Sequence, residues 1–85
     1  MSFKGILVAN RGEIAIRITR AAQDLGLRTV AVYSDDDARS LHTQIADEKI
    51  RLDGVGAAAY LNMEGVIAAA QESNCDAIHP GYGFL

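Results

Sequence analysis

Tryptophan is absent from this 85-residue chain, and cysteine and proline occur once each. The single cysteine, Cys75, excludes an internal disulfide and cannot hold a metal ion by itself, so we expect it to pack as a small apolar side chain. No apolar run approaches the roughly 20 residues that a membrane-spanning helix needs. No basic block is present and the net charge is −3, which argues against nucleic acid as a partner.

The first residues also lack the features of a targeting segment. Residues 1–5 contain neither the apolar core of a signal peptide nor the arginine-rich pattern of a transit peptide, so a cytoplasmic location is expected. What the chain does contain is 49% hydrophobic residues with few aromatics, a composition typical of an α/β domain. At this length, residues 1–85 make one domain.

Strand and helix patterns alternate along the chain. Short apolar or alternating segments predict strands near 5–9, 29–33, 49–52 and 77–78. About three helices are predicted between them, at 13–25, at 40–46 and between Asn62 and Asn74. Asn62 can cap the start of the last helix, and Asn74 tolerates the left-handed conformation that ends many helices. This alternation builds an open parallel sheet with right-handed crossovers, for which the familiar strand order is 3-2-1-4. The expected fold class is therefore α/β.

The first helix has clear boundary signals. Asn10 and Glu13 have the spacing of a capping box at its start, and Gly26 is a natural stop after its end. Apolar residues at helical spacing predict the stripe that packs on the sheet: Ile14, Ile18, Ala21 and Leu25.

Charged residues gather on one side of the same helix: Glu13, Arg17, Arg20 and Asp24. Glu13 and Arg17 have the favourable order for an i,i+4 ion pair. From spacing alone, a solvent-exposed face is the more ordinary interpretation, and a contact with another subunit is the alternative.

Strand order 3-2-1-4 places strands one and four side by side, with the chain reversing direction across the sheet between them. Ligands bind open α/β sheets at such switch points. The loops that meet there would be Asn10, Arg11 and Gly12 after the first strand and residues 79–83 after the fourth. We therefore expect a ligand site at the carboxyl edge of the sheet.

The second of these loops has the composition of a ligand-facing turn. Pro80 forces His79 away from helical geometry. Gly81 and Gly83 permit close approach of the backbone to a ligand, and Tyr82 between them is expected to be exposed. No nucleophile, acid partner or metal-ligating cluster lies beside His79 in the sequence, so no catalytic residue or metal site is predicted. A structural turn, with His79 hydrogen-bonded locally, is the alternative.

The first loop partly matches a dinucleotide-binding fingerprint. Asn10-x-Gly12-x-x-Ala15 supplies two of its three small residues, and aspartates at 35–37 follow the second strand, where a ribose-binding acid would lie. However, the first glycine is missing, and Glu13 places a carboxylate where a pyrophosphate needs free N–H groups. A tight strand–helix turn is the more ordinary interpretation.

Five segments together resemble one known family. They are ILVANRGEIA at 6–15, TVAVYS at 29–34, ADE at 46–48, YLN at 60–62 and HPGYGFL at 79–85. In this order they resemble the amino-terminal domain of biotin carboxylase, a component of acetyl-CoA, propionyl-CoA, methylcrotonyl-CoA and pyruvate carboxylases. The resemblance implies a Rossmann-like domain that precedes an ATP-grasp domain. Residues 53–57 depart from the family's usual sequence, in what is expected to be a surface loop.

The resemblance also implies an activity for the parent protein. The family uses MgATP to activate bicarbonate and then carboxylates N1′ of biotin carried on a lysine of a carrier domain. The ATP-grasp and carboxyl-terminal parts hold the nucleotide, the magnesium ions and the catalytic base, so the isolated 85 residues are expected to be inactive. A carboxyltransferase recognises the final acceptor, which this segment therefore does not reveal.

Family motifs assign roles to particular residues. Tyr82 and Gly83 match residues that line the biotin pocket, where an aromatic ring and a close backbone would orient the ureido ring. The matching positions of the family's homodimer contact are Arg17, Arg20 and Asp24, although the family most often has Glu at the last. A dinucleotide-binding module and a non-catalytic interaction domain are the alternatives to this assignment.

Overall fold

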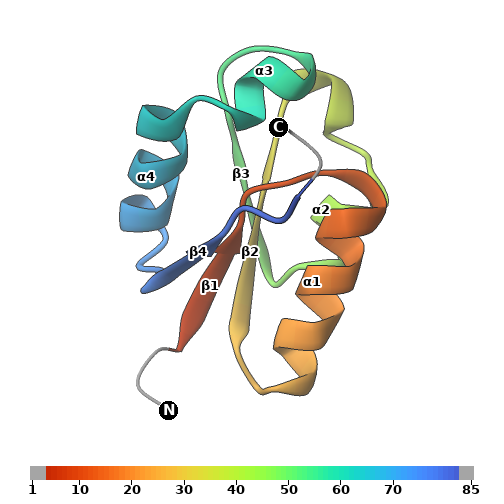
Figure 1. Ribbon diagram of the computed structural model, residues 1–85, viewed down its shortest axis with the longest axis vertical. Coiled ribbons are helices and arrows are strands. Elements are labelled where there is room, and N and C mark those ends of the chain that lie inside the picture. The colour runs from red at the N-terminus through yellow and green to blue at the C-terminus, as the bar shows by residue number, and fades with distance from the viewer. Residues whose placement is uncertain (1–3, 83–85) are drawn as a thin grey trace.

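The computed structural model describes residues 4–82, in which a four-stranded parallel sheet carries helices on both faces (Figure 1). The strands are β1 (Gly5–Val8), β2 (Arg28–Tyr33), β3 (Glu48–Arg51) and β4 (Ala77–His79), in the order β3-β2-β1-β4. β1 pairs with β2 on one side and with β4 on the other, both in parallel. The predicted α/β class and strand order are confirmed, and β1 and β4 end at the same edge of the sheet.

Helices α1 (Gly12–Asp24) and α2 (Leu41–Ile45) cover one face of the sheet, and α3 (Gly56–Tyr60) and α4 (Met63–Glu72) cover the other (Figure 1). Residues 4–82 thus contain four α-helices, not about three, and a short 3-10 helix at Asp35–Asp37. The additional helix is α3, whose five residues follow a glycine-rich segment and have no apolar repeat of their own. Within the same residues, every helix is too short or too polar to cross a membrane.

The main core lies between the sheet and the helices α3 and α4. Leu7, Val30 and Val32 are fully buried there against Tyr60 and Val66. Burial of each such aliphatic side chain contributes about 1.5–3 kcal/mol. Cys75 is partly buried and packs against the same cluster, in keeping with its predicted role.

The boundary signals of the helices are confirmed at three positions. Gly26, after α1, has φ +79°, and Asn74, after α4, has φ +58°, the left-handed conformation that ends many helices. At the start of α4, the Asn62 side chain accepts a hydrogen bond from the Gly65 N–H at 3.2 Å. Local chemistry therefore sets where these helices begin and end.

The buried side of α1 differs from the predicted stripe. Ala15, Thr19 and Ala22 face the interior, whereas Ala21 is exposed and Leu25 is 70% exposed. Small side chains let the helix approach the sheet closely, and the larger apolar residues are left on its flank. The prediction that Leu25 and Ala21 pack on the sheet is therefore wrong.

Candidate functional site

The two switch-point loops meet at the side chain of Asn10, which is only 2% exposed. Its Nδ2 donates hydrogen bonds to the carbonyl oxygens of Pro80 at 2.8 Å and Tyr82 at 3.0 Å. Its Oδ1 accepts one from the Arg11 N–H at 2.8 Å. The predicted meeting of these loops is confirmed. The predicted capping box is wrong, because Arg11 is the N-cap residue and the Asn10 amide is directed to the loop after β4.

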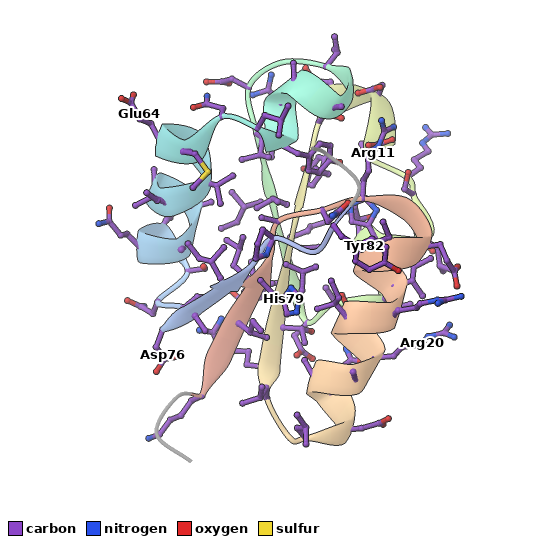
Figure 2. The ribbon with its side chains drawn as sticks, in the orientation of Figure 1. Arg11, Arg20, Glu64, Asp76, His79 and Tyr82 are labelled. Atoms are coloured by element: carbon purple, nitrogen blue, oxygen red, sulfur yellow. The ribbon has the colours of Figure 1, made fainter. Side chains whose placement is uncertain are left out.

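The loop after β4 is held by its backbone and by His79. The Ala9 N–H donates to the His79 carbonyl at 2.9 Å, and the Gly81 N–H donates to His79 Nδ1 at 3.0 Å. This is the local hydrogen bond of the structural alternative, and it makes His79 part of the turn. Tyr82 is 64% exposed, as predicted, whereas Gly83 lies outside the described residues. Figure 2 shows Tyr82 near the start of α1 and His79 at the end of β4.

Among the described residues of this loop, Gly81 occupies a position that requires glycine. Its φ is +69°, a conformation that costs other residues roughly 1–2 kcal/mol. A Cβ there would also lie 2.5 Å from Asn10 Nδ2 and 2.9 Å from Ile14 Cγ2. Close approach of the loop to Asn10 therefore depends on the missing side chain.

Arg11 connects the first loop to the segment after β2. One guanidinium nitrogen donates to Asp37 Oδ1 at 2.7 Å, and the guanidinium carbon lies 5.8 Å from the centre of the Tyr60 ring. Burial alone would raise the pKa of Asp37, but hydrogen bonds from Arg11 and Tyr60 outweigh it and hold that pKa below its ordinary value. The carboxylate is therefore charged and fully engaged by the protein.

Tyr60 is buried and binds Asp37 from the interior of the domain. Its hydroxyl donates to Asp37 Oδ2 at 2.7 Å and accepts from the Ser34 N–H at 3.2 Å. Burial, together with the hydrogen bond to Asp37, raises the pKa of Tyr60 to about 12. No local pattern predicts that Tyr60 and Asp37 meet, because the contact joins residues 23 positions apart through the unpredicted helix α3.

This geometry disfavours dinucleotide binding at the first loop. Asp37 is 7% exposed and bonded to Arg11 and Tyr60, and Asp36 accepts hydrogen bonds from the Ser34 hydroxyl and the Gly56 N–H. Both carboxylates are thus engaged by protein groups, and Asp35 is paired with Arg51. The described residues also contain no cluster of three or more His, Cys, Asp or Glu that could hold a metal ion.

An apolar groove of about 260 Å³ opens beside the loop after β4. Its walls come from the residue after β1, from β4 and the following loop, and from α3, α4 and the residue that lines the groove between them: Ala9, Tyr60, Leu61, Met63, Val66, Ile78, Pro80, Gly81 and Tyr82. Leu61 and Met63, two large apolar side chains that line the groove, are 54% and 63% exposed to solvent. An exposed apolar surface next to the switch point is suited to a flat, partly apolar ligand or to another domain.

The charged side chains of α1 take no part in the hydrogen bonds by which Asn10 joins the two loops. Arg17, Arg20 and Asp24 are exposed, and Arg20 projects away from the sheet (Figure 2). Arg17 Nε lies 3.2 Å from Glu13 Oε1, which confirms the predicted i,i+4 pair. A second apolar groove, of about 310 Å³, runs along the flank of α1 and includes Arg17, Ile18, Ala21 and Leu25.

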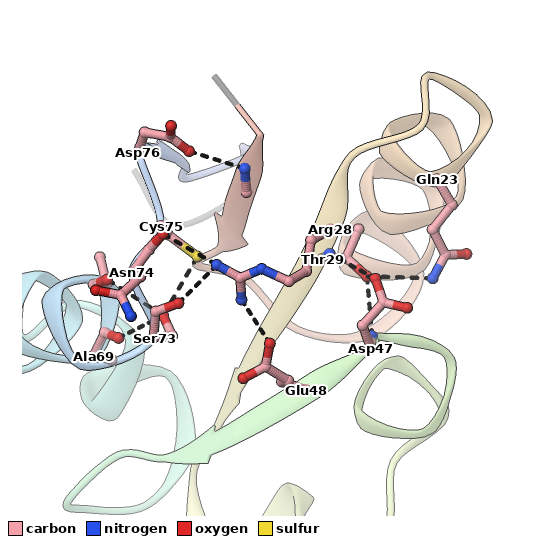
Figure 3. A network of polar contacts seen from close by, with 12 residues as sticks. Gln23, Arg28, Thr29, Asp47, Glu48, Ala69, Ser73, Asn74, Cys75 and Asp76 are labelled. Carbon is pink, nitrogen blue, oxygen red and sulfur yellow. Dashed lines mark hydrogen bonds and ion pairs between the residues drawn. The ribbon is translucent and has the colours of Figure 1, made fainter. Parts of the chain in front are cut away.

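At the opposite edge of the sheet, polar contacts fasten the strands rather than form a site (Figure 3). Arg28 donates to Glu48 at 2.6 Å and to the Ser73 carbonyl at 2.7 Å, which joins β2 to β3 and to the end of α4. Asp76 Oδ1 accepts from the N–H groups of Lys4 and Gly5, and these bonds lower the pKa of its carboxyl.

Comparison with known proteins identifies one family. The family model described as biotin carboxylase, N-terminal domain, matches residues 2–85. The chain is 52% identical to biotin carboxylase of Nostoc sp. over 86 residues, which covers 100% of this chain and 19% of that protein. It is 55% identical to human mitochondrial pyruvate carboxylase over 85 residues, covering 96% of this chain and 7% of that protein.

A solved structure agrees with these sequence relatives. The biotin carboxylase domain of a single-chain bacterial carboxylase superimposes with a TM-score of 0.92 at 54% identity, over 96% of this chain and 19% of that one. The chain thus spans less than a fifth of the length of each of these three proteins.

Proposed function

This chain belongs to the family of biotin carboxylase N-terminal domains, and we propose that it contributes the surface that orients biotin in a biotin-dependent carboxylase. The parent enzyme would use MgATP and bicarbonate to carboxylate biotin on a carrier domain. The observation that carries the proposal is the junction of the two switch-point loops at Asn10, which presents exposed Tyr82 beside an apolar groove. Both loops belong to the segments that resemble the family.

The final acceptor is recognised elsewhere in the parent protein. Similar identities, 55–60%, relate this chain to a pyruvate carboxylase and to a methylcrotonoyl-CoA carboxylase subunit of Glycine max. A domain equally similar to enzymes with different named acceptors does not distinguish among them. The carboxyltransferase, the biotin carrier domain and the ATP-grasp and C-terminal domains are the partners that complete the enzyme.

Tyr82 would act by positioning. Its ring is exposed beside the loop backbone, which Asn10 holds at two carbonyls. An aromatic face and a fixed backbone restrict the orientation of a flat bicyclic ring, and correct orientation supplies a large part of many rate enhancements. Leu61, Met63 and Tyr82 leave the groove open to solvent, and the other domains of the parent would cover this opening.

Replacing Tyr82 tests this role in the full-length carboxylase. Tyr82→Ala is expected to raise KM for free biotin about two- to tenfold, because one aromatic contact contributes about 0.5–1.5 kcal/mol. Tyr82→Phe keeps the ring and should stay close to the wild type. Equal kinetics for Tyr82→Ala and the wild type would remove Tyr82 from the biotin surface.

The nucleotide and its magnesium ions would be held outside this chain. Residues 4–82 provide no candidate metal cluster, the Asn10 amide after β1 is bonded to the loop after β4, and Glu13 places a carboxylate in the first turn of α1. We therefore expect the purified 85-residue chain to lack bicarbonate-dependent ATP hydrolysis that the full-length enzyme catalyses. Turnover above a blank in the isolated chain would contradict this expectation.

The charged flank of α1 would form the subunit contact of the parent homodimer. Arg17, Arg20 and Asp24 are exposed there beside an apolar groove, and Leu25 adds 70% of its surface to the same flank. Arg20→Glu should shift the full-length enzyme from dimer toward monomer in sedimentation velocity. Arg39→Glu, a charge reversal at an exposed arginine on another part of the surface, is the matched control. An unchanged dimer in Arg20→Glu would separate this flank from the interface.

A further inference from the structure

We propose that Asn10 is a positioning residue whose side-chain amide fixes the loop that carries Tyr82. The contact itself is independent of the proposed function, whereas its consequence for catalysis depends on the role proposed for Tyr82. Asn10 lies directly after β1, on the rigid part of the sheet, and its side chain crosses to the loop after β4, some 70 residues later in the sequence.

The amide uses its hydrogen-bonding groups in one defined orientation. Oδ1 accepts from the Arg11 N–H at 2.8 Å, so Nδ2 must face the loop. Both Nδ2 hydrogens then have acceptors, the carbonyls of Pro80 and Tyr82. These two carbonyls flank Gly81, so the loop is held on both sides of its left-handed residue. A side chain that is only 2% exposed and bonded in this way has little freedom to reorient.

The steric fit of Gly81 supports the same assignment. A Cβ at residue 81 would lie 2.5 Å from Asn10 Nδ2, closer than non-bonded atoms approach. The amide and the glycine therefore form one complementary contact, in which the donor group occupies the space that a side chain would fill.

Arg11 links this contact to the neighbouring strand. The residue that donates to Asn10 Oδ1 also binds Asp37 through its guanidinium group, and Asp37 is bonded to buried Tyr60. The position of the Tyr82 loop is thus set relative to β1, β2 and α3 at once. A displacement of about 1 Å at a substrate-orienting group can lower a rate by roughly a hundredfold.

Asn10→Asp is the informative substitution. It preserves the shape of the side chain and its acceptor for the Arg11 N–H, but it replaces two donors with an oxygen that faces two carbonyl oxygens. Asn62→Asp is the matched control, because Asn62 only accepts a hydrogen bond, from the Gly65 N–H, and aspartate accepts equally well. Gly81→Ala disrupts the same contact from the loop side and leaves Asn10 intact.

The experiment uses the full-length carboxylase, with hydrogen–deuterium exchange of the peptide that covers residues 79–82 and steady-state kinetics with free biotin. Asn10→Asp and Gly81→Ala should each increase exchange of the backbone N–H groups in this peptide about tenfold or more. The reason is that the two lost hydrogen bonds hold the loop in place, so the loop opens more often without them. Asn10→Asp should also raise KM for biotin while KM for ATP stays constant. Asn62→Asp should match the wild type in both measurements.

The outcomes separate the inference from the function it rests on. Wild-type exchange in Asn10→Asp and Gly81→Ala would overturn the contact, whatever happens to biotin. Faster exchange with unchanged biotin kinetics, while Tyr82→Ala impairs them, would overturn the catalytic consequence alone. Unchanged biotin kinetics in Tyr82→Ala would overturn the proposed function, and the exchange data would still decide whether Asn10 fixes the loop. If Asn10→Asp fails to fold, Gly81→Ala provides the same test.

Discussion

Replacing Tyr60 with phenylalanine is expected to lower the free energy of unfolding by about 2–4 kcal/mol. The ring is 3% exposed, and phenylalanine fills the same space, so the change isolates the hydroxyl group. That hydroxyl donates to Asp37 at 2.7 Å and accepts from the Ser34 N–H at 3.2 Å. Ser34 is fully buried, so its N–H would be left without its Tyr60 acceptor away from water.

The magnitude follows from these two hydrogen bonds. A hydrogen bond to a charged acceptor contributes about 1.5–3 kcal/mol, and a buried N–H without an acceptor costs about 1–3 kcal/mol. The total is smaller than their sum, because both bonds involve one oxygen atom and phenylalanine removes the cost of burying that oxygen. Loss of the Tyr60 donor should also raise the pKa of Asp37, since this hydrogen bond is one of the causes that hold it down.

Urea denaturation of the chain, followed by far-ultraviolet circular dichroism, measures the change. Tyr33→Phe is the control, because Tyr33 is only half-buried and its hydroxyl makes no hydrogen bond among the residues from 4 to 82. That variant should lie within about 0.5 kcal/mol of the wild type. A Tyr60→Phe variant as stable as Tyr33→Phe, with the same denaturant dependence, would refute the argument that the polar cluster is tightly bonded.

Three further changes test the core, a buried histidine and a helix cap. Leu7→Ala, at a position with 0% exposure, should lower the free energy of unfolding by about 2–5 kcal/mol. Leu25→Ala, at 70% exposure, should lower it by less than about 0.5 kcal/mol. Equal losses in the two variants would mean that Leu25 packs in the core, as the predicted stripe of α1 required. His42 is 1% exposed with Nε2 3.1 Å from the Val32 carbonyl, and burial lowers its pKa below the ordinary value of 6.5, so its neutral form is the folded one. The contribution of neutral His42 to the free energy of unfolding should be complete above about pH 6.5. Below that pH it should fall by at most about 1.4 kcal/mol per pH unit. Urea titrations from pH 7 to pH 5 measure this slope, and His42→Gln should remove it. Asn62→Ala should cost about 1 kcal/mol through loss of the α4 cap, and a melting temperature equal to that of Asn62→Asp would contradict it.

The carboxyl-edge site could be predicted in position but not in its contacts. Strand order follows from the alternation of elements and the right-handed crossover, so the meeting of the loops after β1 and β4 was accessible from the sequence. The exposure of Tyr82 also followed from its place between Gly81 and Gly83. The partner of Asn10 did not, because a local cap with Glu13 and a distant contact with Pro80 are equally compatible with the sequence around it.

The predicted packing of α1 was wrong for a related reason. Its helical spacing contains two apolar stripes, one of large residues and one of small residues around Ala15 and Ala22. Periodicity alone favours the larger side chains, but the close approach of the helix to the sheet selects the smaller ones. The same limitation applies to α3, which is too short to have a periodic signal and contributes Tyr60 to the core.

By itself, the sequence determined the alternating elements, their parallel order, the turn residues at Gly26, Asn62 and Asn74, and the resemblance to a family. These properties depend on local backbone preferences and on hydrophobic periodicity, which neighbouring residues encode. Only the tertiary structure decided that the Asn10 amide binds the loop after β4, that Arg11 and Tyr60 engage Asp37, and which side of α1 is buried. Those choices depend on which donors, acceptors and volumes lie opposite one another once distant segments pack together, and no local pattern records that arrangement.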